Sequence, residues 1–208
     1  MPRILLVDNY FVREKASELE KSIASHGASV TVIGSAGSSA AKFDEFDGVV
    51  LSGSPAMLSA EDSEAPYTGE MDAIRRSTVP VLGICFGHQL MSIAYGSEVL
   101  QAPSPTKRYV RTEIVGKDAL FSGLPKTISV FESHHEIVET VPKDFVLLAR
   151  SRTSPVAAMR HGKRPLFGVQ FHPERNTPER PHGDVFVGNF VRACGRNARI
   201  QHSGRKET

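Results

Sequence analysis

Cysteine, tryptophan and long apolar runs are scarce in this sequence of 208 residues, which has two cysteines and no tryptophan. The two thiols, Cys85 and Cys194, are too few for a disulfide-stabilised scaffold or a four-thiolate zinc site. No apolar run approaches the roughly 20 residues of a membrane-spanning helix. The first apolar run has four residues before Asp8, whereas a secretory signal needs about 7–15. These absences predict a cytoplasmic protein that does not associate with membranes.

A strong excess of charge of either sign is also missing, because 25 Lys and Arg stand against 23 Asp and Glu. Nucleic-acid-binding proteins usually carry a strong basic patch, so no nucleic-acid partner is expected. The length fits one globular domain, which we predict at residues 1–195. Residues 196–208 are polar, basic and without apolar periodicity, and they predict a flexible tail. An arm that binds RNA or a partner is the less favoured alternative for this tail.

Short apolar runs alternate with helical patterns over the first 95 residues. The runs at 4–7, 30–33, 49–51 and 79–84 are typical of strands buried on both faces. Between them, apolar residues recur at helical spacing at Val12, Ala16, Leu19 and Ile23, and again near 67–74 and 88–95. This alternation predicts an α/β fold, with a mostly parallel sheet and helices on both faces.

The pattern changes after about residue 99. Short β-like pieces at 109–115, 127–133, 145–149, 156–159 and 166–170 are separated by turns that contain Gly or Pro. They predict an antiparallel or mixed extension of the sheet. A last helix is predicted at residues 184–193, so Cys194 is expected to lie beyond it.

Cys85 lies at the junction of a predicted strand and a predicted helix, between Gly83 and Gly87. Small residues at this spacing allow a sharp turn that exposes the central side chain, as in the G-x-S-x-G nucleophile elbow. The partial positive charge of the helix N-terminus favours a thiolate. The free N–H groups there can receive an oxyanion. The alternative is a buried structural cysteine, which is the usual environment of a free thiol.

A cysteine nucleophile needs a base, and His172 is the best candidate. It follows the predicted strand at 166–170, and Glu174 lies two residues further on. In an extended segment these two side chains point the same way, so the carboxylate can orient the imidazole towards Cys85. Taken alone, a His-Pro-Glu sequence is more typical of a surface turn.

Taken together, these motifs resemble the class I, triad-type glutamine amidotransferases. That family carries G-x-C-x-G-x-Q on an elbow and H-P-E far downstream, as residues 83–89 and 172–174 do here. The resemblance extends from about residue 3 to residue 193. It implies that Cys85 attacks the side-chain carboxamide of glutamine, that His172 passes a proton to the leaving ammonia, and that Glu174 orients His172. Water then hydrolyses the thioester to glutamate.

The resemblance also implies an oxyanion site. Its donors would be the backbone N–H of Phe86 and one N–H of the turn at residues 52–55, from either Gly53 or Ser54. The family usually has a second glycine where Ser54 stands. The two parts should lie close together because both follow neighbouring parallel strands at the carboxyl edge of the sheet.

Binding of the amino-acid end of the substrate is implied for Gln89 and for the backbone of Ser133, His134 and His135. In this segment His135 replaces a small residue of the family, and Glu136 replaces an aspartate. Adjacent residues of a strand point to opposite faces, so the two histidines are not expected to form a metal site.

Within the family, the elbow, the segment after Ser133 and the segment after Gly168 resemble the amidotransferase unit of GMP synthetase. The sequence has neither a phosphate-binding P-loop nor the Ser-Gly-Gly-x-Asp-Ser loop of an ATP-pyrophosphatase. The resemblance therefore implies a glutaminase subunit without a cofactor of its own, in purine biosynthesis. A separate synthetase subunit would hold ATP and Mg and use the ammonia.

Two other functions stay open at this point. Ser54 and Phe86 also occur in stand-alone hydrolases that act on γ-glutamyl compounds. A non-catalytic regulator that keeps the fold is the third possibility, and the intact Cys85, His172 and Glu174 argue against it.

Overall fold

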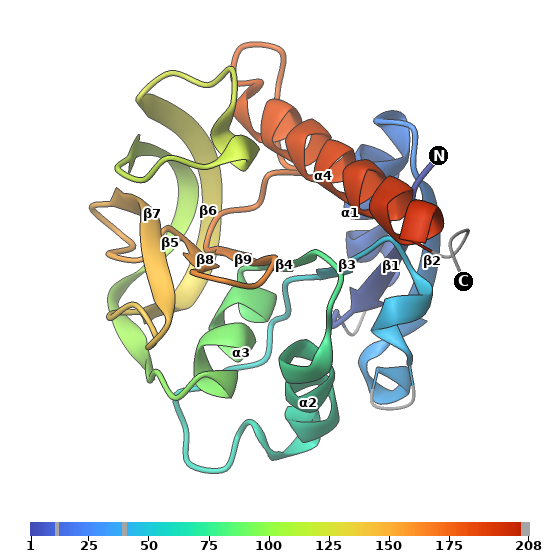
Figure 1. Cartoon of the computed structure of the whole chain (residues 1–208). Coiled ribbons are helices and arrows are strands. Elements are labelled where there is room, and N and C mark those ends of the chain that lie inside the picture. Colours follow the sequence, from blue (N-terminus) through green and yellow to red (C-terminus); the bar gives the residue numbers. More distant parts are fainter. Residues whose placement is uncertain (11–12, 39–40, 205–208) are drawn as a thin grey trace.

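A computed structural model of the protein describes residues 1–10, 13–38 and 41–204 (Figure 1). Within these residues one nine-stranded sheet has the order β2-β1-β3-β4-β9-β8-β7-β5-β6. Its strands are β1 (Arg3–Asp8), β2 (Ser29–Gly34), β3 (Gly48–Leu51), β4 (Val81–Ile84), β5 (Val99–Ile114), β6 (Thr127–Val138), β7 (Phe145–Ser151), β8 (Ala158–His161) and β9 (Leu166–Val169). The helices are α1 (Arg13–Ser25), α2 (Thr68–Arg76), α3 (Phe86–Ala94) and α4 (His182–Gly204).

The parallel half of the sheet comprises β2, β1, β3, β4 and β9. Alternate residues of β1 enter two different cores, because successive side chains of a strand point to opposite faces. Ile4 and Leu6 belong to the core that contains residues of α1 and α4, whereas Leu5 and Val7 belong to the core with α2 and α3. The predicted sheet with helices on both faces is confirmed.

The antiparallel half contains β8, β7, β5 and β6, and it continues the same sheet from β9. The free edge of β6 then meets the segment that follows β9, where the N–H of His172 donates to the carbonyl of Phe131 at 2.7 Å. The antiparallel half therefore curls back on itself. This curvature holds the His172 segment against β6.

The helix predicted at 184–193 is longer than expected, and it continues through Cys194 to Gly204. The expectation that Cys194 lies beyond the helix is wrong: its side chain is buried against Gly48, where an added Cβ would lie 2.2 Å from its Sγ. A helix with one face in solvent can be as polar as a coil, so composition alone did not reveal the extension. Of the predicted tail, residues 205–208 lie outside the described residues, as does Val12 of the predicted first helix.

β5 also begins earlier than predicted, at Val99 instead of residue 109. Its register with β6 shifts between Gln101 and Thr106, around Pro103 and Pro105. Proline cannot donate to a β-ladder, so this stretch lacks the sequence pattern of a regular strand. No helix in the described part of the chain has the length and apolar character required to cross a membrane.

Candidate active site

Cys85 lies at the N-cap of α3 with a φ of 51° and a ψ of −99°. A non-glycine residue in such a backbone conformation is strained by about 1–3 kcal/mol. The two glycines permit the turn because neither position has room for a side chain. A Cβ added to Gly83 would lie 2.4 Å from the carbonyl oxygen of Gly87, and a Cβ added to Gly87 would lie 2.7 Å from the carbonyl oxygen of Leu51. The sharp strand-to-helix turn predicted from the glycine spacing is therefore present. Cys85 itself is 5% exposed and lines a pocket.

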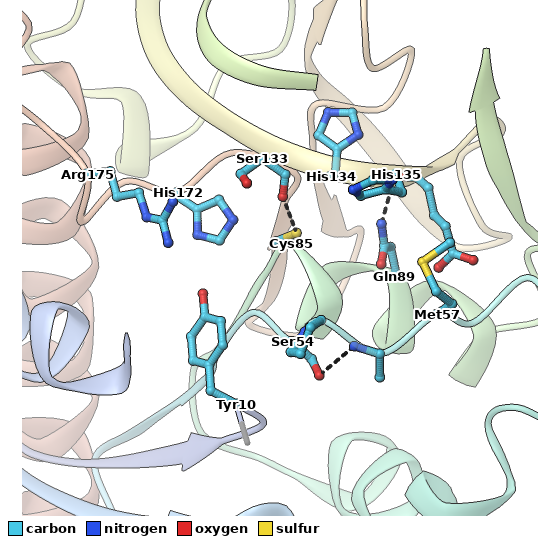
Figure 2. Close-up of a pocket in the computed structure, with 13 residues that line it drawn as sticks. Tyr10, Ser54, Met57, Cys85, Gln89, Ser133, His134, His135, His172 and Arg175 are labelled. Carbon is cyan, nitrogen blue, oxygen red and sulfur yellow. Dashed lines mark hydrogen bonds between the residues drawn. The ribbon is translucent and has the colours of Figure 1, made fainter. Parts of the chain in front are cut away.

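His172 and Glu174 meet as the extended geometry predicts, with Nδ1 of the imidazole 2.8 Å from Oε1 of the carboxylate. Both side chains are almost fully buried. Burial opposes a charge on His172, but the negative charges of Glu174 and Cys85 outweigh it and raise the pKa of His172 to about 10. The imidazole also hydrogen-bonds with Cys85, and Figure 2 shows the two side chains next to each other. The arrangement favours a thiolate–imidazolium pair.

Gln170 is a neighbour of the sulfur that the sequence interpretation missed. Its Nε2 donates to Cys85 Sγ at 3.6 Å, and its Oε1 accepts from Gln89 Nε2 at 3.4 Å. Gln170 and His172 are two residues apart at the end of β9, so both can point towards the elbow. That spacing was the available signal. A fully buried amide donor at the sulfur stabilises negative charge there.

The turn at residues 52–55 lies beside the elbow, since the N–H of Gly87 donates to the Ser52 carbonyl at 3.2 Å. Ser54 lines the pocket, and an added Cβ at Gly53 would lie 3.0 Å from Cε1 of His172. Phe86 opens α3, where the first amides of a helix have no partner within the helix. The turn with Gly53 and Ser54 and the start of α3 at Phe86 thus lie next to each other, and of these three residues Ser54 lines the pocket.

The backbone of β6 forms another wall, which includes Ser133, His134 and His135 (Figure 2). The side chains of the two histidines separate, as the alternation of a strand requires. His135 is exposed, whereas His134 is buried with its Nε2 2.8 Å from Glu132 Oε2. Across the described ranges no group of three or more His, Cys, Asp or Glu side chains could hold a metal ion. Gln89 reaches this wall through a bond from its Nε2 to the Glu136 carbonyl at 2.8 Å.

Glu132 is a fully buried carboxylate that anchors this wall from inside. Besides His134, it accepts from the hydroxyls of Ser151 and Thr153, at 3.0 and 2.7 Å, and of Ser154 at 3.1 Å. Burial alone would raise the pKa of Glu132, but these hydrogen bonds and the His134 charge lower it. The network fixes the strand that carries Ser133.

Glu136 connects β6 to the loop that carries the turn at 52–55. Glu136 is 2% exposed, and its carboxylate accepts from the backbone N–H groups of Leu58 at 2.7 Å and Ser59 at 2.8 Å. The sequence showed only that a glutamate stands where the family has an aspartate. The partners of Glu136 lie 78 and 77 residues away, so no local pattern could reveal them.

Tyr10 and Arg175 also line the pocket and were not predicted. The Tyr10 hydroxyl lies close to Gly53, where an added Cβ would be 2.6 Å from it. Burial and the charges of Glu174 and Cys85 raise the pKa of Tyr10, so this phenol stays protonated. The guanidinium of Arg175 lies 5.4 Å from the centre of the Phe131 ring. The pocket has a volume of about 210 Å³, which suits a small metabolite rather than a drug-sized ligand.

The buried carboxylate of Glu70 supports the turn at residues 52–55 through Asn9. Glu70 of α2 is 1% exposed and accepts from Asn9 Nδ2 at 3.1 Å, while the Asn9 backbone N–H donates to Ser52 Oγ at 2.9 Å. Burial raises the pKa of Glu70 to about 7. The turn therefore rests on a polar group whose charge changes near neutral pH.

Sequence comparison relates the chain to glutamine amidotransferases. The sequence model of the family "Glutamine amidotransferase class-I" matches residues 5–194. The chain is 39% identical over 148 residues to one subunit of the glutamine-hydrolysing GMP synthase of Pyrococcus furiosus, covering 71% of this chain and 76% of that one. It is 42% identical over 153 residues to the corresponding subunit of Methanopyrus kandleri, with the same coverage.

Solved structures agree with the sequence relatives. A Thermoplasma acidophilum protein, described as the corresponding GMP synthase subunit, superposes with a TM-score of 0.86 at 28% identity, over 97% of this chain and 98% of that one. A glutamine amidotransferase of Thermotoga maritima gives a TM-score of 0.70 at 22% identity, over 84% and 77% of the two chains. The second likeness concerns the fold alone.

Proposed function

Because this chain belongs to the class I glutamine amidotransferase family, we propose that it is the glutaminase subunit of a two-subunit GMP synthase. It hydrolyses glutamine and supplies the ammonia to a separate synthetase subunit. The observation that carries the proposal is the convergence of the strained Cys85 with the His172–Glu174 pair at one pocket. The relatives that are GMP synthase subunits favour this function over a stand-alone γ-glutamyl hydrolase.

In the proposed mechanism the Cys85 thiolate attacks the side-chain carbonyl carbon of glutamine. A C–S bond forms, and negative charge moves to the carbonyl oxygen. The backbone N–H of Phe86 and an amide of the turn at 52–55 stabilise this charge. His172 then donates its proton to the leaving nitrogen, the C–N bond breaks, and ammonia departs from a thioester.

Hydrolysis of the thioester completes the cycle. The neutral His172 takes a proton from water, the resulting hydroxide adds to the thioester carbon, and the C–S bond breaks to give glutamate and the Cys85 thiolate. Glu174 keeps the imidazole in the required orientation and stabilises its charged form. Gln89 and the β6 backbone at Ser133 and His135 bind the amino-acid end of glutamine.

The proposed partner is an ATP-pyrophosphatase subunit in purine biosynthesis, in the cytoplasm. This chain needs no cofactor for the glutaminase reaction, and ATP and Mg belong to the partner's reaction. The pocket is lined by amide, hydroxyl, imidazole and thiol groups together with the charged side chains of Glu136 and Arg175, and such a polar lining suits a zwitterionic amino acid.

Purified protein tests the proposal through glutamate release from glutamine. Cys85→Ala should remove the activity while the protein keeps its circular dichroism spectrum. Cys194→Ala, the matched change at the other thiol, should keep it. Adding nucleotide together with the ATP-pyrophosphatase subunit should increase the glutaminase rate. Undiminished hydrolysis by Cys85→Ala would rule out the thioester mechanism.

A further inference from the structure

A face of the β5–β6 ribbon beside the pocket carries side chains that the proposed chemistry does not use. The antiparallel register pairs Lys107 with Ser133, Tyr109 with Phe131, and Arg111 with Ser129. Directly paired residues of antiparallel strands point to the same side of the sheet. These side chains therefore extend the pocket wall that begins at Ser133.

Two arginines from the segment after His172 stack on the aromatic rings of this face. Arg175 lies 5.4 Å from the ring centre of Phe131, and Arg180 lies 4.3 Å from that of Tyr109. The two rings are themselves in edge contact at 5.3 Å. Stacking holds a guanidinium plane in place and leaves its N–H edge available for a carboxylate. We call Lys107, Arg111, Arg175, Arg180, Tyr109 and Phe131 the basic face.

The basic face concentrates positive charge in a chain that is nearly neutral overall. Lys107, Arg111 and Arg180 are exposed. Three acidic residues lie near this face. The carboxylate of Glu18 lies 4.0 Å from Arg175, and Glu113, at the end of the ribbon, is paired with Arg150 and Lys126. Glu179 precedes Arg180 and interacts with its charge, so the face keeps a net positive charge from Lys107, Arg111 and the two stacked arginines.

The opposite rim of the pocket carries an exposed apolar side chain, that of Met57. Met57 lines the pocket and is 41% exposed. Arginine, methionine and the aromatic residues are the types that protein interfaces favour over the remaining surface. The mouth of the pocket is thus bordered by the residue types of an interface on both sides.

We propose that the basic face and Met57 form the docking surface for an acidic surface of the ammonia-accepting subunit. This inference rests on the proposed function and identifies the side of the molecule at which the partner binds. A partner in this position covers the mouth of the pocket. Ammonia then passes to the partner without entering bulk water, where a proton would occupy its nucleophilic lone pair.

The test reverses charge at two residues of the basic face that do not line the pocket, in the variant Lys107→Glu/Arg111→Glu. The matched control is Lys143→Glu/Lys163→Glu, with the same change in net charge. Both control lysines are exposed and occupy turns that meet through a bond from the Gly162 N–H to the Asp144 carbonyl. These turns lie at the amino end of β9, away from His172.

The glutaminase rate is titrated with the ATP-pyrophosphatase subunit from the same organism, at low and at high salt. We expect Lys107→Glu/Arg111→Glu to raise the apparent Kd by about tenfold or more, because like charges then face each other. The loss should shrink at high salt, and the control should titrate like the unmodified protein. Glutaminase activity without the partner should be unchanged in both variants.

The alternative outcomes are distinct. Equal apparent Kd values for the basic-face variant and the control would overturn the docking surface and leave the proposed function intact. No response of the unmodified protein to the partner would overturn both. Should the glutamate variant lose its basal activity, Lys107→Gln/Arg111→Gln replaces it. An unchanged Kd in that milder variant would equally refute the inference.

Discussion

Replacement of Glu136 should loosen the active-site loop without touching the reacting groups. Its carboxylate accepts from the backbone N–H groups of Leu58 and Ser59 at 2.7 and 2.8 Å, and the residue is 2% exposed. These bonds attach the loop with the turn at 52–55 to β6. The loop therefore depends on one side chain for its position over the pocket.

The magnitude follows from the number and type of these bonds. A hydrogen bond to a charged group contributes about 1.5–3 kcal/mol to stability. Glu136→Ala leaves both backbone donors without their acceptor, so the free energy of unfolding should fall by about 3–6 kcal/mol. Glu136→Gln keeps one acceptor and sets its NH2 group against the other N–H, so about half of that loss is expected.

Activity should fall with the position of the loop. Complete loss of one oxyanion donor lowers kcat by about a hundredfold to a thousandfold, so a turn that is displaced but still present should lower kcat by less, about tenfold to a hundredfold. Denaturant unfolding and steady-state glutaminase kinetics measure the two effects. Glu139→Gln is the matched control, because that glutamate of the same segment is exposed and its change should stay within about 0.5 kcal/mol. Equal stability and kcat in Glu136→Gln and the unmodified protein would refute the reasoning.

Three further predictions concern titrating groups. The pKa of His172 is raised to about 10, so kcat/KM should decline as the pH rises through that value. Glu174→Gln removes a negative charge that raises the pKa of His172, so the decline should move to lower pH. An unmoved pH–rate profile would contradict the role of Glu174 as the partner of the imidazole. Burial raises the pKa of Glu70 in the folded protein to about 7, from an ordinary 4.5. Between these two pH values the folded state binds a proton that the unfolded state has released, so the free energy of unfolding should fall as the pH rises from 4.5 to 7. Glu70→Gln should flatten that slope in unfolding experiments, and an identical slope in both proteins would argue against a buried acid. Burial and the charge of Asp47 raise the pKa of the Cys194 thiol, so iodoacetamide should modify Cys85 before Cys194, as mass spectrometry of the native protein can show; the reverse order would contradict the burial.

The parallel half of the fold was predictable because its signals are local. An apolar run such as residues 4–7 reports burial on both faces wherever the strand lies in the sheet. The start of β5 and the end of α4 were missed for a related reason. Pro103 and Pro105 disrupt the strand pattern locally, and the polar surface of α4 after Gly195 resembles that of a coil. In both places long-range packing decided what local sequence could not.

The residues of the candidate site also fall into two groups, those that local sequence predicts and those that only the tertiary structure reveals. The turn at Cys85 and the His172–Glu174 pair follow from spacings of two residues, because the backbone conformation between such neighbours nearly fixes their relative direction. Tyr10, Arg175 and Glu136 became visible only in three dimensions. Glu136 and Arg175 reach the pocket from segments whose position depends on how the antiparallel half curls, and Tyr10 reaches it from the segment after β1, at the carboxyl edge of the parallel half.

By itself, the sequence determined the chemistry: a thiol on a glycine-flanked turn, a histidine with its carboxylate, and an α/β sheet to carry them. These features depend on residue type and on short separations along the chain. The tertiary structure decided the environment of that chemistry. The bond between His172 and Phe131 closes the antiparallel half over β6, and this closure creates the pocket and sets the basic face beside its mouth. Contacts between distant segments depend on the summed packing of the whole chain, which no short stretch of sequence contains.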